Sequence, residues 1–222
     1  MTEPALDPLD LAALLCSRVC HDVISPVGAI INGLEVLDEE KDAEMRGFAL
    51  DLIKKSAEQA SAVLQFSRLA FGAAGSAGAL IDTSDAEKVA RGFFNRERTT
   101  LSWNLPSLLM SKNKVKLILN LCLIAAAAIP RGGIIDVSLG SAADLETIEV
   151  TAKGANARLA AHLPGLITAK EVHQPATPQD VQAYYARLVA ETAKMNLSVT
   201  CKPDRVSLKA ESLPFQAVAE AL

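Results

Sequence analysis

Residues 8–37 read PLDLAALLCSRVCHDVISPVGAIINGLEVL, an apolar stretch with isolated charged and polar residues. Its leucine, isoleucine and valine residues recur at steps of three and four, which is the spacing of one face of an amphipathic helix. The recurring apolar positions are Leu11, Leu14, Leu15, Val19, Ile24, Val27, Ile31, Leu34 and Leu37. With a rise of about 1.5 Å per residue, such a helix is roughly 45 Å long. The sequence therefore predicts one long helix near the start of the chain.

A second periodic segment follows a polar turn, residues 38–42, and runs from about Ala43 to Phe71. Its apolar positions are Met45, Phe48, Leu52, Ile53, Ala57, Ala60, Val63, Leu64 and Leu69. Two long helices joined by a short turn form an antiparallel hairpin. Since a lone hairpin cannot bury both apolar stripes, we expect two copies of the chain to pair as a homodimer around a four-helix bundle.

The composition changes after a segment rich in glycine and alanine, residues 72–79, which is typical of a linker. We therefore divide the chain into a helical hairpin, residues 1–76, and a second domain, residues 77–222. Helix patterns in the second domain cover residues 84–94, 112–128 and 181–195, and strand patterns cover 99–103, 134–139, 146–152, 197–201 and 206–209. This mixed order predicts an α+β sandwich in which helices cover one sheet.

The bulk properties exclude several classes of protein. Half of the 222 residues are hydrophobic and the net charge is -4, without a basic cluster that would indicate nucleic-acid binding. The first ten residues lack the positive start of a secretory signal. The most apolar window, Val115 to Ile129, is too short to span a bilayer of about 30 Å. We therefore expect a soluble, cytoplasmic protein that binds neither nucleic acid nor membrane.

The segment His21 to Pro26, HDVISP, combines a histidine, a carboxylate and a proline inside the predicted first helix. Proline within a helix removes a backbone hydrogen bond and costs about 3 kcal/mol, so a sequence that keeps Pro26 must gain something from the local bend. A neutral imidazole nitrogen is a nucleophile near neutral pH, and the adjacent Asp22 can orient the ring or accept a proton. We interpret His21 as the residue that is phosphorylated, with Asp22 as its catalytic neighbour.

Small and polar residues surround His21 and leave room for the active site of another protein. Ser17 and Ser25 lie four residues either side of it and share its helix face, and the hairpin turn places the region of Ser61 opposite. The candidate partner-binding residues are Ser25, Gly28, Asn32 and Gly33 on the first helix and Ser61, Gln65 and Arg68 on the second. Helix packing is an equal alternative for Gly28, Asn32 and Gly33.

Other histidines and the cysteines receive no chemical role. Cys16 and Cys20 precede His21 with a spacing one residue longer than that of haem attachment, and zinc would need two further ligands. We therefore expect no metal. The four cysteines lie in or beside apolar runs, which favours buried thiols in a reducing compartment. His162 and His173 lie in proline-containing stretches without close acidic partners.

The pattern His21, Asp22, Val23, Ile24, Ser25, Pro26 resembles the phosphoacceptor box of sensor histidine kinases. That box reads histidine, an acidic residue, an apolar residue, two variable residues and proline. The predicted hairpin is similar to the dimerisation and histidine-phosphotransfer domain of these kinases. The resemblance implies that the second domain has the α/β sandwich of their ATPase domain.

The second domain departs from the nucleotide-binding motifs of those kinases. Their Asn-Leu-Leu-x-Asn-Ala helix corresponds to Asn120–Ala125, where the second asparagine is replaced by Ile124, which cannot coordinate a metal. Their Asp-x-Gly-x-Gly motif corresponds to a stretch that begins at Ala152 and ends at Asn156. Residues 175–190 contain no glycine where the kinases have a glycine-rich lid. The fold pattern is kept while the nucleotide contacts are lost.

A kinase-like chain with a degenerate ATPase domain resembles the ChpT-type histidine phosphotransferases. The resemblance spans nearly the whole chain and includes residues 15–30, 65–72 and 129–133. It implies a phosphorelay through His21 between receiver-domain aspartates, from a hybrid kinase of the CckA type to response regulators of the CtrA and CpdR types. It further implies that the chain uses no ATP and no cofactor of its own, with Mg²⁺ brought by the receiver.

Two alternatives stay open from the sequence. The first is an ATP-dependent histidine kinase, which the missing asparagine and aspartate equivalents argue against. The second is a non-catalytic dimerisation scaffold, which Pro26 argues against because a scaffold gains nothing from a proline inside its helix.

Overall fold

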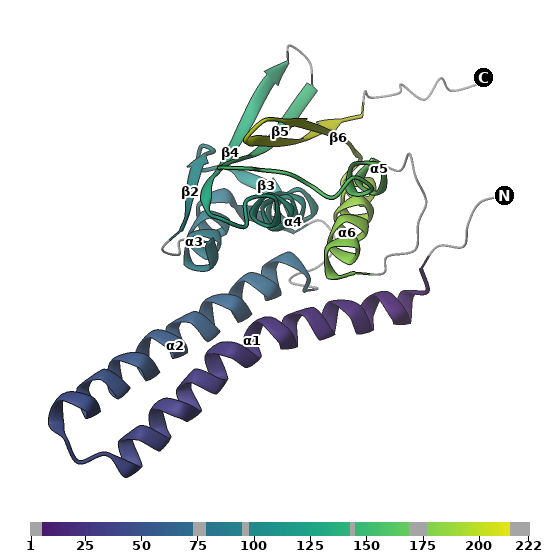
Figure 1. Ribbon diagram of the computed structural model, residues 1–222. Helices are drawn as coiled ribbons and strands as arrows, with labels where there is room; N and C mark the ends of the chain where they lie inside the picture. The colour runs from purple at the N-terminus through teal and green to yellow at the C-terminus, as the bar shows by residue number, and fades with distance from the viewer. Residues whose placement is uncertain (1–5, 73–78, 95–97, 143–144, 169–176, 214–222) are drawn as a thin grey trace, which may run out of the picture.

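The computed structural model describes residues 6–72, 79–94, 98–142, 145–168 and 177–213. Its first two helices, α1 (Pro8–Glu39) and α2 (Ala43–Ala70), form an antiparallel hairpin that projects from an α/β domain (Figure 1). Asp7 and Asp42 cap the two helices, since each carboxylate accepts a hydrogen bond from a first-turn backbone N–H, at 2.8 and 3.0 Å. The predicted helical hairpin is confirmed.

Helix α1 continues through Pro26, which is buried inside it. A proline ring removes a backbone hydrogen bond and crowds the carbonyl four residues earlier, here that of Asp22. The axis of α1 changes direction near its middle (Figure 1), as a proline inside a helix predicts. The loss of this backbone bond affects the helical turn that carries Asp22 and its neighbour His21.

Gly33 allows α1 and α2 to approach closely. It is buried, and a Cβ atom built on it would lie 2.6 Å from Cγ1 of Ile53 and 3.3 Å from the carbonyl oxygen of Ala49, both on α2. Helix packing is therefore the role that its surroundings favour for Gly33, over the partner contact that we considered from the sequence.

We expect Gly33→Val to lower the free energy of unfolding by about 1–3 kcal/mol, because an overpacked interface forces its neighbours to shift. Gly28→Ala is the matched change on the same helix. Nothing lies within 4 Å of a Cβ atom at that position, and alanine favours a helix over glycine by roughly 0.8–1 kcal/mol, so we expect it to stabilise. Urea unfolding followed by circular dichroism measures both changes. Equal effects of the two variants would contradict the packing role of Gly33.

The α/β domain follows the hairpin. Its elements are β1 (Leu80–Asp82), α3 (Thr83–Phe94), β2 (Thr99–Asn104), β3 (Leu109–Ser111), α4 (Lys112–Ala128), β4 (Gly133–Ala142), β5 (Leu145–Lys153), α5 (Leu163–Ile167), α6 (Pro178–Thr192), β6 (Met195–Lys202) and β7 (Arg205–Ser212). A five-stranded sheet has the order β2-β4-β5-β7-β6. Strand β2 runs parallel to β4, and the other neighbours are antiparallel. Strands β1 and β3 form a separate antiparallel pair.

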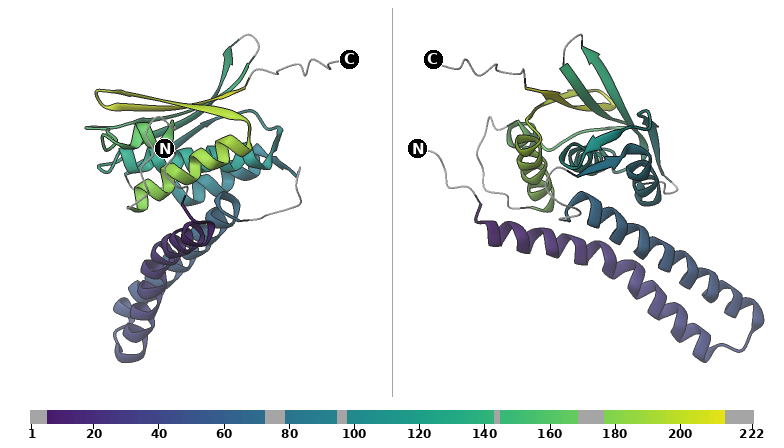
Figure 2. Two further views of the ribbon diagram at one scale, coloured as in Figure 1. Left: turned by 90° about the vertical axis from the view of Figure 1, so that its right-hand side faces the viewer. Right: turned by 180° about the vertical axis from the view of Figure 1, so that it is seen from behind.

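Helices α3, α4 and α6 cover one face of the five-stranded sheet (Figures 1 and 2). Helix α4 is the centre of the core, because its residues from Leu117 to Ala125 are all buried. Alternate residues of the strands, among them Ile135 and Val150, are buried as well. The domain is thus a two-layer sandwich of one sheet and one layer of helices.

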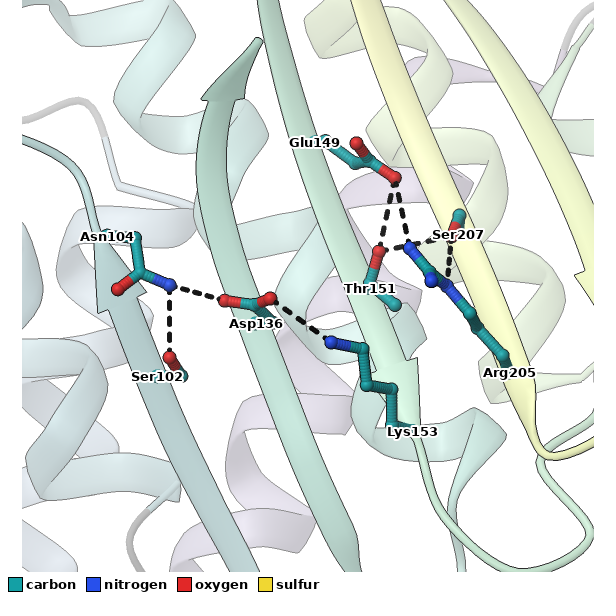
Figure 3. A network of polar contacts seen from close by, with 8 residues as sticks. All are labelled: Ser102, Asn104, Asp136, Glu149, Thr151, Lys153, Arg205 and Ser207. Carbon is teal, nitrogen blue, oxygen red and sulfur yellow. Dashed lines mark hydrogen bonds and ion pairs between the residues drawn. The ribbon is translucent and has the colours of Figure 1, made fainter.

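The opposite face of the sheet carries polar side chains (Figure 3). Asp136 accepts a hydrogen bond from Nδ2 of Asn104 at 2.6 Å and lies 3.4 Å from Nζ of Lys153. Farther across the sheet, Arg205 lies 3.8 Å from Glu149. Exposed ion pairs such as these contribute only about 0–1 kcal/mol each. Burial of the apolar side chains on the other face therefore determines which face of the sheet meets the helices.

The predicted α+β sandwich after the hairpin is confirmed, and the sequence missed only parts of it. Strands β1 and β3 and helix α5 are too short for a periodic pattern to reveal. The division of the chain at residue 76 stays a prediction, since it falls outside the described residues.

Helix α1 is long and apolar enough to cross a membrane by length and composition alone. A buried core helix and a signal sequence pass the same test. This feature is therefore weak support for a membrane span.

The expectation of buried thiols is correct for Cys122 alone. Burial raises the pKa of the Cys122 thiol above its ordinary value. The other three thiols are exposed. Cys16 and Cys20 lie on α1, and Cys201 lies on β6, the edge strand of the sheet.

Candidate functional site

His21 lies in the middle of α1 with its imidazole ring open to solvent. The side chain is 88% exposed, and its Nδ1 lies 3.4 Å from Oδ1 of Asp22. The carboxylate of Asp22 is thus near enough to orient one ring nitrogen while the other points elsewhere. An exposed imidazole on a helix surface can be reached by the active site of another protein.

Arg18 lies one helical turn before His21. The spacings of three and four residues place it on the same face as His21 and Asp22. Burial of the guanidinium lowers its pKa from the ordinary value, and the charge of Asp22 opposes that shift. Since arginine remains protonated at neutral pH, it places a positive charge beside the imidazole. We expected no role for Arg18 from the sequence, although the helical spacing alone places it near His21.

A cavity of about 430 Å³ separates this part of α1 from the α/β domain. On α1 it is lined by Ser17, Arg18, His21 and Asp22, together with Leu14. The facing wall comes from α4, α6, the start of α5 and the segments before α5 and α6. It is largely apolar, with Thr177 and Gln182 as polar members beside Leu123, Ile124, Ala127, Leu159, Leu163, Val181 and Ala183. The histidine therefore stands at the mouth of a cleft between the hairpin and the α/β domain.

The candidate partner-binding residues of α1 differ in their accessibility. Ser25 and Asn32 are exposed, and Gly28 is half-buried with open space around its Cα atom. Gly33 is buried against α2. Three of the four are thus available to a partner that approaches α1.

The candidate residues of α2 are exposed but do not line the cavity of His21. Ser61 and Gln65 line a different groove, between α2 and α3, where Nε2 of Gln65 donates a hydrogen bond to Oγ of Ser61 at 3.0 Å. Arg68 is exposed near the end of the helix. The hairpin turn predicts the level of these residues along α2 but not the helix face on which they lie.

His162 has an acidic partner, contrary to the expectation from the sequence. Its Nε2 lies 2.6 Å from Oδ1 of Asp180, which is buried at the start of α6. The same carboxylate accepts a hydrogen bond from the backbone N–H of Thr177, as part of a capping box. Because these contacts join α5 to α6, they stabilise the wall of the cleft. His173 lies outside the described residues.

The positions compared with nucleotide-binding motifs have other surroundings here. Ile124 is buried at the wall of the cleft, and Asn120 is buried among protein groups. Asn156 has a positive φ of 59°, and its backbone N–H donates a hydrogen bond to Oδ1 of Asp204 at 2.6 Å. In the part of the chain that the structure describes, no three His, Cys, Asp or Glu side chains gather as metal ligands would.

Comparison with known proteins identifies the family of this chain. Residues 83–205 match the histidine phosphotransferase C-terminal domain. The protein phosphotransferase ChpT of Brucella abortus (strain 2308) is 48% identical over 207 residues, which cover 93% of this chain and 97% of that protein. A solved bacterial phosphotransferase is 43% identical with a TM-score of 0.81, and the match covers 95% of this chain and all of that one. The chain therefore belongs to the family of ChpT-type histidine phosphotransferases.

Proposed function

We propose that this phosphotransferase carries the phosphoryl group on His21 and relays it between aspartates of two receiver domains. The observation that supports the proposal is the exposed imidazole of His21 beside a carboxylate at the mouth of a cleft. A receiver domain brings its own aspartyl phosphate and Mg²⁺, so that the chain needs no ATP site and no cofactor.

The transfer follows from the orientation of the imidazole. Nδ1 lies 3.4 Å from the carboxylate of Asp22. We assign the proton to this nitrogen, which leaves the lone pair of Nε2 to attack the phosphorus atom of the aspartyl phosphate. The N–P bond forms while the P–O bond to the receiver breaks, and the carboxylate of the receiver leaves with the electron pair. The imidazolium that results keeps its proton on Nδ1, where Asp22 stabilises it. Onward transfer to a second receiver reverses these steps.

Arg18 supplies positive charge on the same side of α1. Phosphoryl transfer passes through a loose transition state whose charge is spread over the equatorial oxygens, so it depends on positioning and charge neutralisation. A guanidinium with five N–H donors can contact those oxygens. We infer that Arg18 helps to hold the phosphoryl group between His21 and the receiver.

We expect Arg18→Ala to lower the rate of transfer by at least roughly tenfold, because it removes a charged donor from the transition state. Arg18→Lys keeps the charge without the planar fork and should give an intermediate rate. Quenched-flow labelling from a phosphorylated receiver measures both rates. Arg131→Ala, which removes an exposed arginine outside the cleft, is the control and should leave the rate unchanged. Equal rates for all three variants would exclude this role for Arg18.

The hairpin favours a homodimer with a four-helix bundle at its centre. Large apolar side chains lie exposed along both helices: Ile24, Val27, Ile31 and Leu34 on α1, and Met45, Phe48 and Leu52 on α2. A second copy of the hairpin would bury these residues. The partners then meet the two copies of His21 on the outside of a bundle.

The cellular setting is part of the proposal. The 48% identity with a ChpT protein supports a hybrid kinase of the CckA type as donor and response regulators of the CtrA and CpdR types as acceptors. Such receivers belong to the cytoplasm, where we place this chain, without nucleic acid or membrane as partners.

Labelling with radioactive phosphate tests the proposed function in two arms. One arm offers ATP alone, and the other offers a receiver domain that already carries the label. We expect label only from the receiver. Label from ATP would instead show a histidine kinase, and label in neither arm, with receivers that phosphorylate a known phosphotransferase, would leave the scaffold alternative.

A further inference from the structure

A buried pair of side-chain amides, of which one lines the cavity of His21, joins three helices beside the cleft. Asn120 on α4 is fully buried, and its Nδ2 donates hydrogen bonds to the carbonyl oxygens of Ala70 at 3.0 Å and Lys116 at 2.7 Å. Its Oδ1 accepts a hydrogen bond from Nε2 of Gln182 on α6 at 2.7 Å, and Gln182 is only 2% exposed. Helices α2, α4 and α6 are thereby connected at one point.

The direction of these hydrogen bonds is fixed by the groups involved. Two carbonyl oxygens can only accept, so the Asn120 atom that faces them must be the amino group. The oxygen of Asn120 then faces Gln182, which must donate. Neither amide can be turned around without placing two acceptors or two donors together in a buried site, at a cost of about 1–3 kcal/mol.

The bond to Ala70 connects the α/β domain to the hairpin. Ala70 is the last residue of α2, and the final carbonyls of an α-helix have no partner within the helix. Asn120 thus caps the C-terminal end of α2 from the neighbouring domain. Ring contacts reinforce the junction, since Phe66 stacks on Phe93 of α3 with centroids 4.2 Å apart, and Phe71 lies 5.6 Å from Tyr185 of α6.

The same two helices form the wall that faces His21. Leu123 and Ile124 lie one turn beyond Asn120 on α4, and Val181 precedes Gln182 on α6. Gln182 also lines the cavity, whereas Asn120 does not. We therefore expect a change at Asn120 to alter how this wall is held relative to α1 without changing a residue that lines the cavity. The amide pair thus joins the end of the hairpin to the two helices that line the cleft.

We propose that Asn120 and Gln182 are positioning residues for phosphotransfer, which fix the α/β domain on the hairpin so that a receiver meets His21 and the cleft wall as one preformed surface. This inference rests on the proposed function of His21. It assigns to Asn120 a task in domain orientation, because both polar atoms of its amide are occupied by other groups of the chain.

Kinetics with two kinds of phosphoryl donor test the proposal. In Asn120→Ala, which leaves the cavity lining unchanged, we expect the KM for a phosphorylated receiver to rise roughly tenfold if the competent orientation falls to about a tenth of the population. Gln182→Met should raise it as well, although that change also alters one residue that lines the cavity. The kcat should change little. Labelling of His21 by phosphoramidate, a small donor that needs no docking surface, should be unchanged. If neither donor labels the wild-type chain, the proposed function of His21 is refuted. That outcome differs from an unchanged KM in the variants, which refutes this inference.

A variant that only destabilises the fold separates positioning from stability. Val150 on β5 is fully buried and lies away from the hairpin, so Val150→Ala should lower the melting temperature and leave the KM unchanged. If Val150→Ala raises the KM as much as Asn120→Ala at an equal loss of stability, or if Asn120→Ala keeps the wild-type KM, the inference is wrong.

A distance measurement reports the orientation directly. One spin label is placed on Lys54→Cys in α2 and the other on Lys202→Cys in β6, so that the pair spans the contact between the hairpin and the α/β domain. The exposed cysteines Cys16, Cys20 and Cys201 are changed to serine. Excess unlabelled protein ensures that each assembly contains only one labelled copy. Pulsed electron resonance should give a narrow distance distribution with the native amides and a broadened one with Asn120→Ala. An unchanged distribution would overturn the proposal.

Discussion

His21→Gln is expected to abolish the transfer of label from a phosphorylated receiver, with a loss of at least about a thousandfold, as for removal of a catalytic nucleophile. Glutamine has no nitrogen lone pair that can attack phosphorus, whereas its size and polarity suit an exposed helix position. Because the histidine side chain is 88% exposed, the free energy of unfolding should stay within about 0.5 kcal/mol of the wild-type value. Scintillation counting of gels that are not exposed to acid measures the label, and urea unfolding measures the free energy of unfolding.

His162→Gln is the matched control for this experiment. His162 also lies beside a carboxylate, with its Nε2 2.6 Å from Oδ1 of Asp180. This contact joins the start of α5 to the start of α6 and lies outside α1. We expect this variant to lose some stability and to keep the label. If His21→Gln retained the label while His162→Gln lost it, the phosphorylated residue would be His162 and the proposed mechanism would be wrong.

The fold was predictable where one residue pattern extended over many turns. The leucine spacing of α1 and α2 gave both helices, and the apolar run of α4 gave the central helix of the sandwich. The parallel pairing of β2 with β4 was not predictable, since it joins strands about thirty residues apart and periodicity describes only neighbours in the chain.

The candidate site shows the same limit. His21 and Asp22 were found because they are adjacent in sequence, and Arg18 could have been found because helical spacing is known in advance. The cleft could not, since its walls come from α1, α4 and α6. Similarly, the level of Ser61 on α2 followed from the hairpin, whereas the face it occupies depends on where α3 packs.

The combined change Ile31→Glu and Phe48→Glu is expected to convert a dimer into monomers. These side chains are 51% and 61% exposed in the single chain, so carboxylates are tolerated there by an isolated hairpin. Burying an isoleucine or phenylalanine at an interface contributes about 1.5–3 kcal/mol, and two-fold symmetry counts each substitution twice. The Kd of the dimer should therefore rise by at least about a thousandfold. Sedimentation velocity over a range of protein concentrations measures it.

Leu109→Glu controls for the loss of a large exposed apolar residue. This leucine is 65% exposed on β3, in the α/β domain and away from the exposed apolar residues of α1 and α2. It should leave the dimer intact. A wild-type chain that sediments as a monomer at all concentrations would exclude the four-helix bundle, and a double variant that stays dimeric would place the interface elsewhere.

The rate of phosphotransfer by the monomeric variant shows whether the receiver needs both copies of the chain. If its rate with a phosphorylated receiver equals that of the wild type, one hairpin and its own α/β domain form the whole docking surface. A rate that falls with the dimer would show that the receiver contacts both copies.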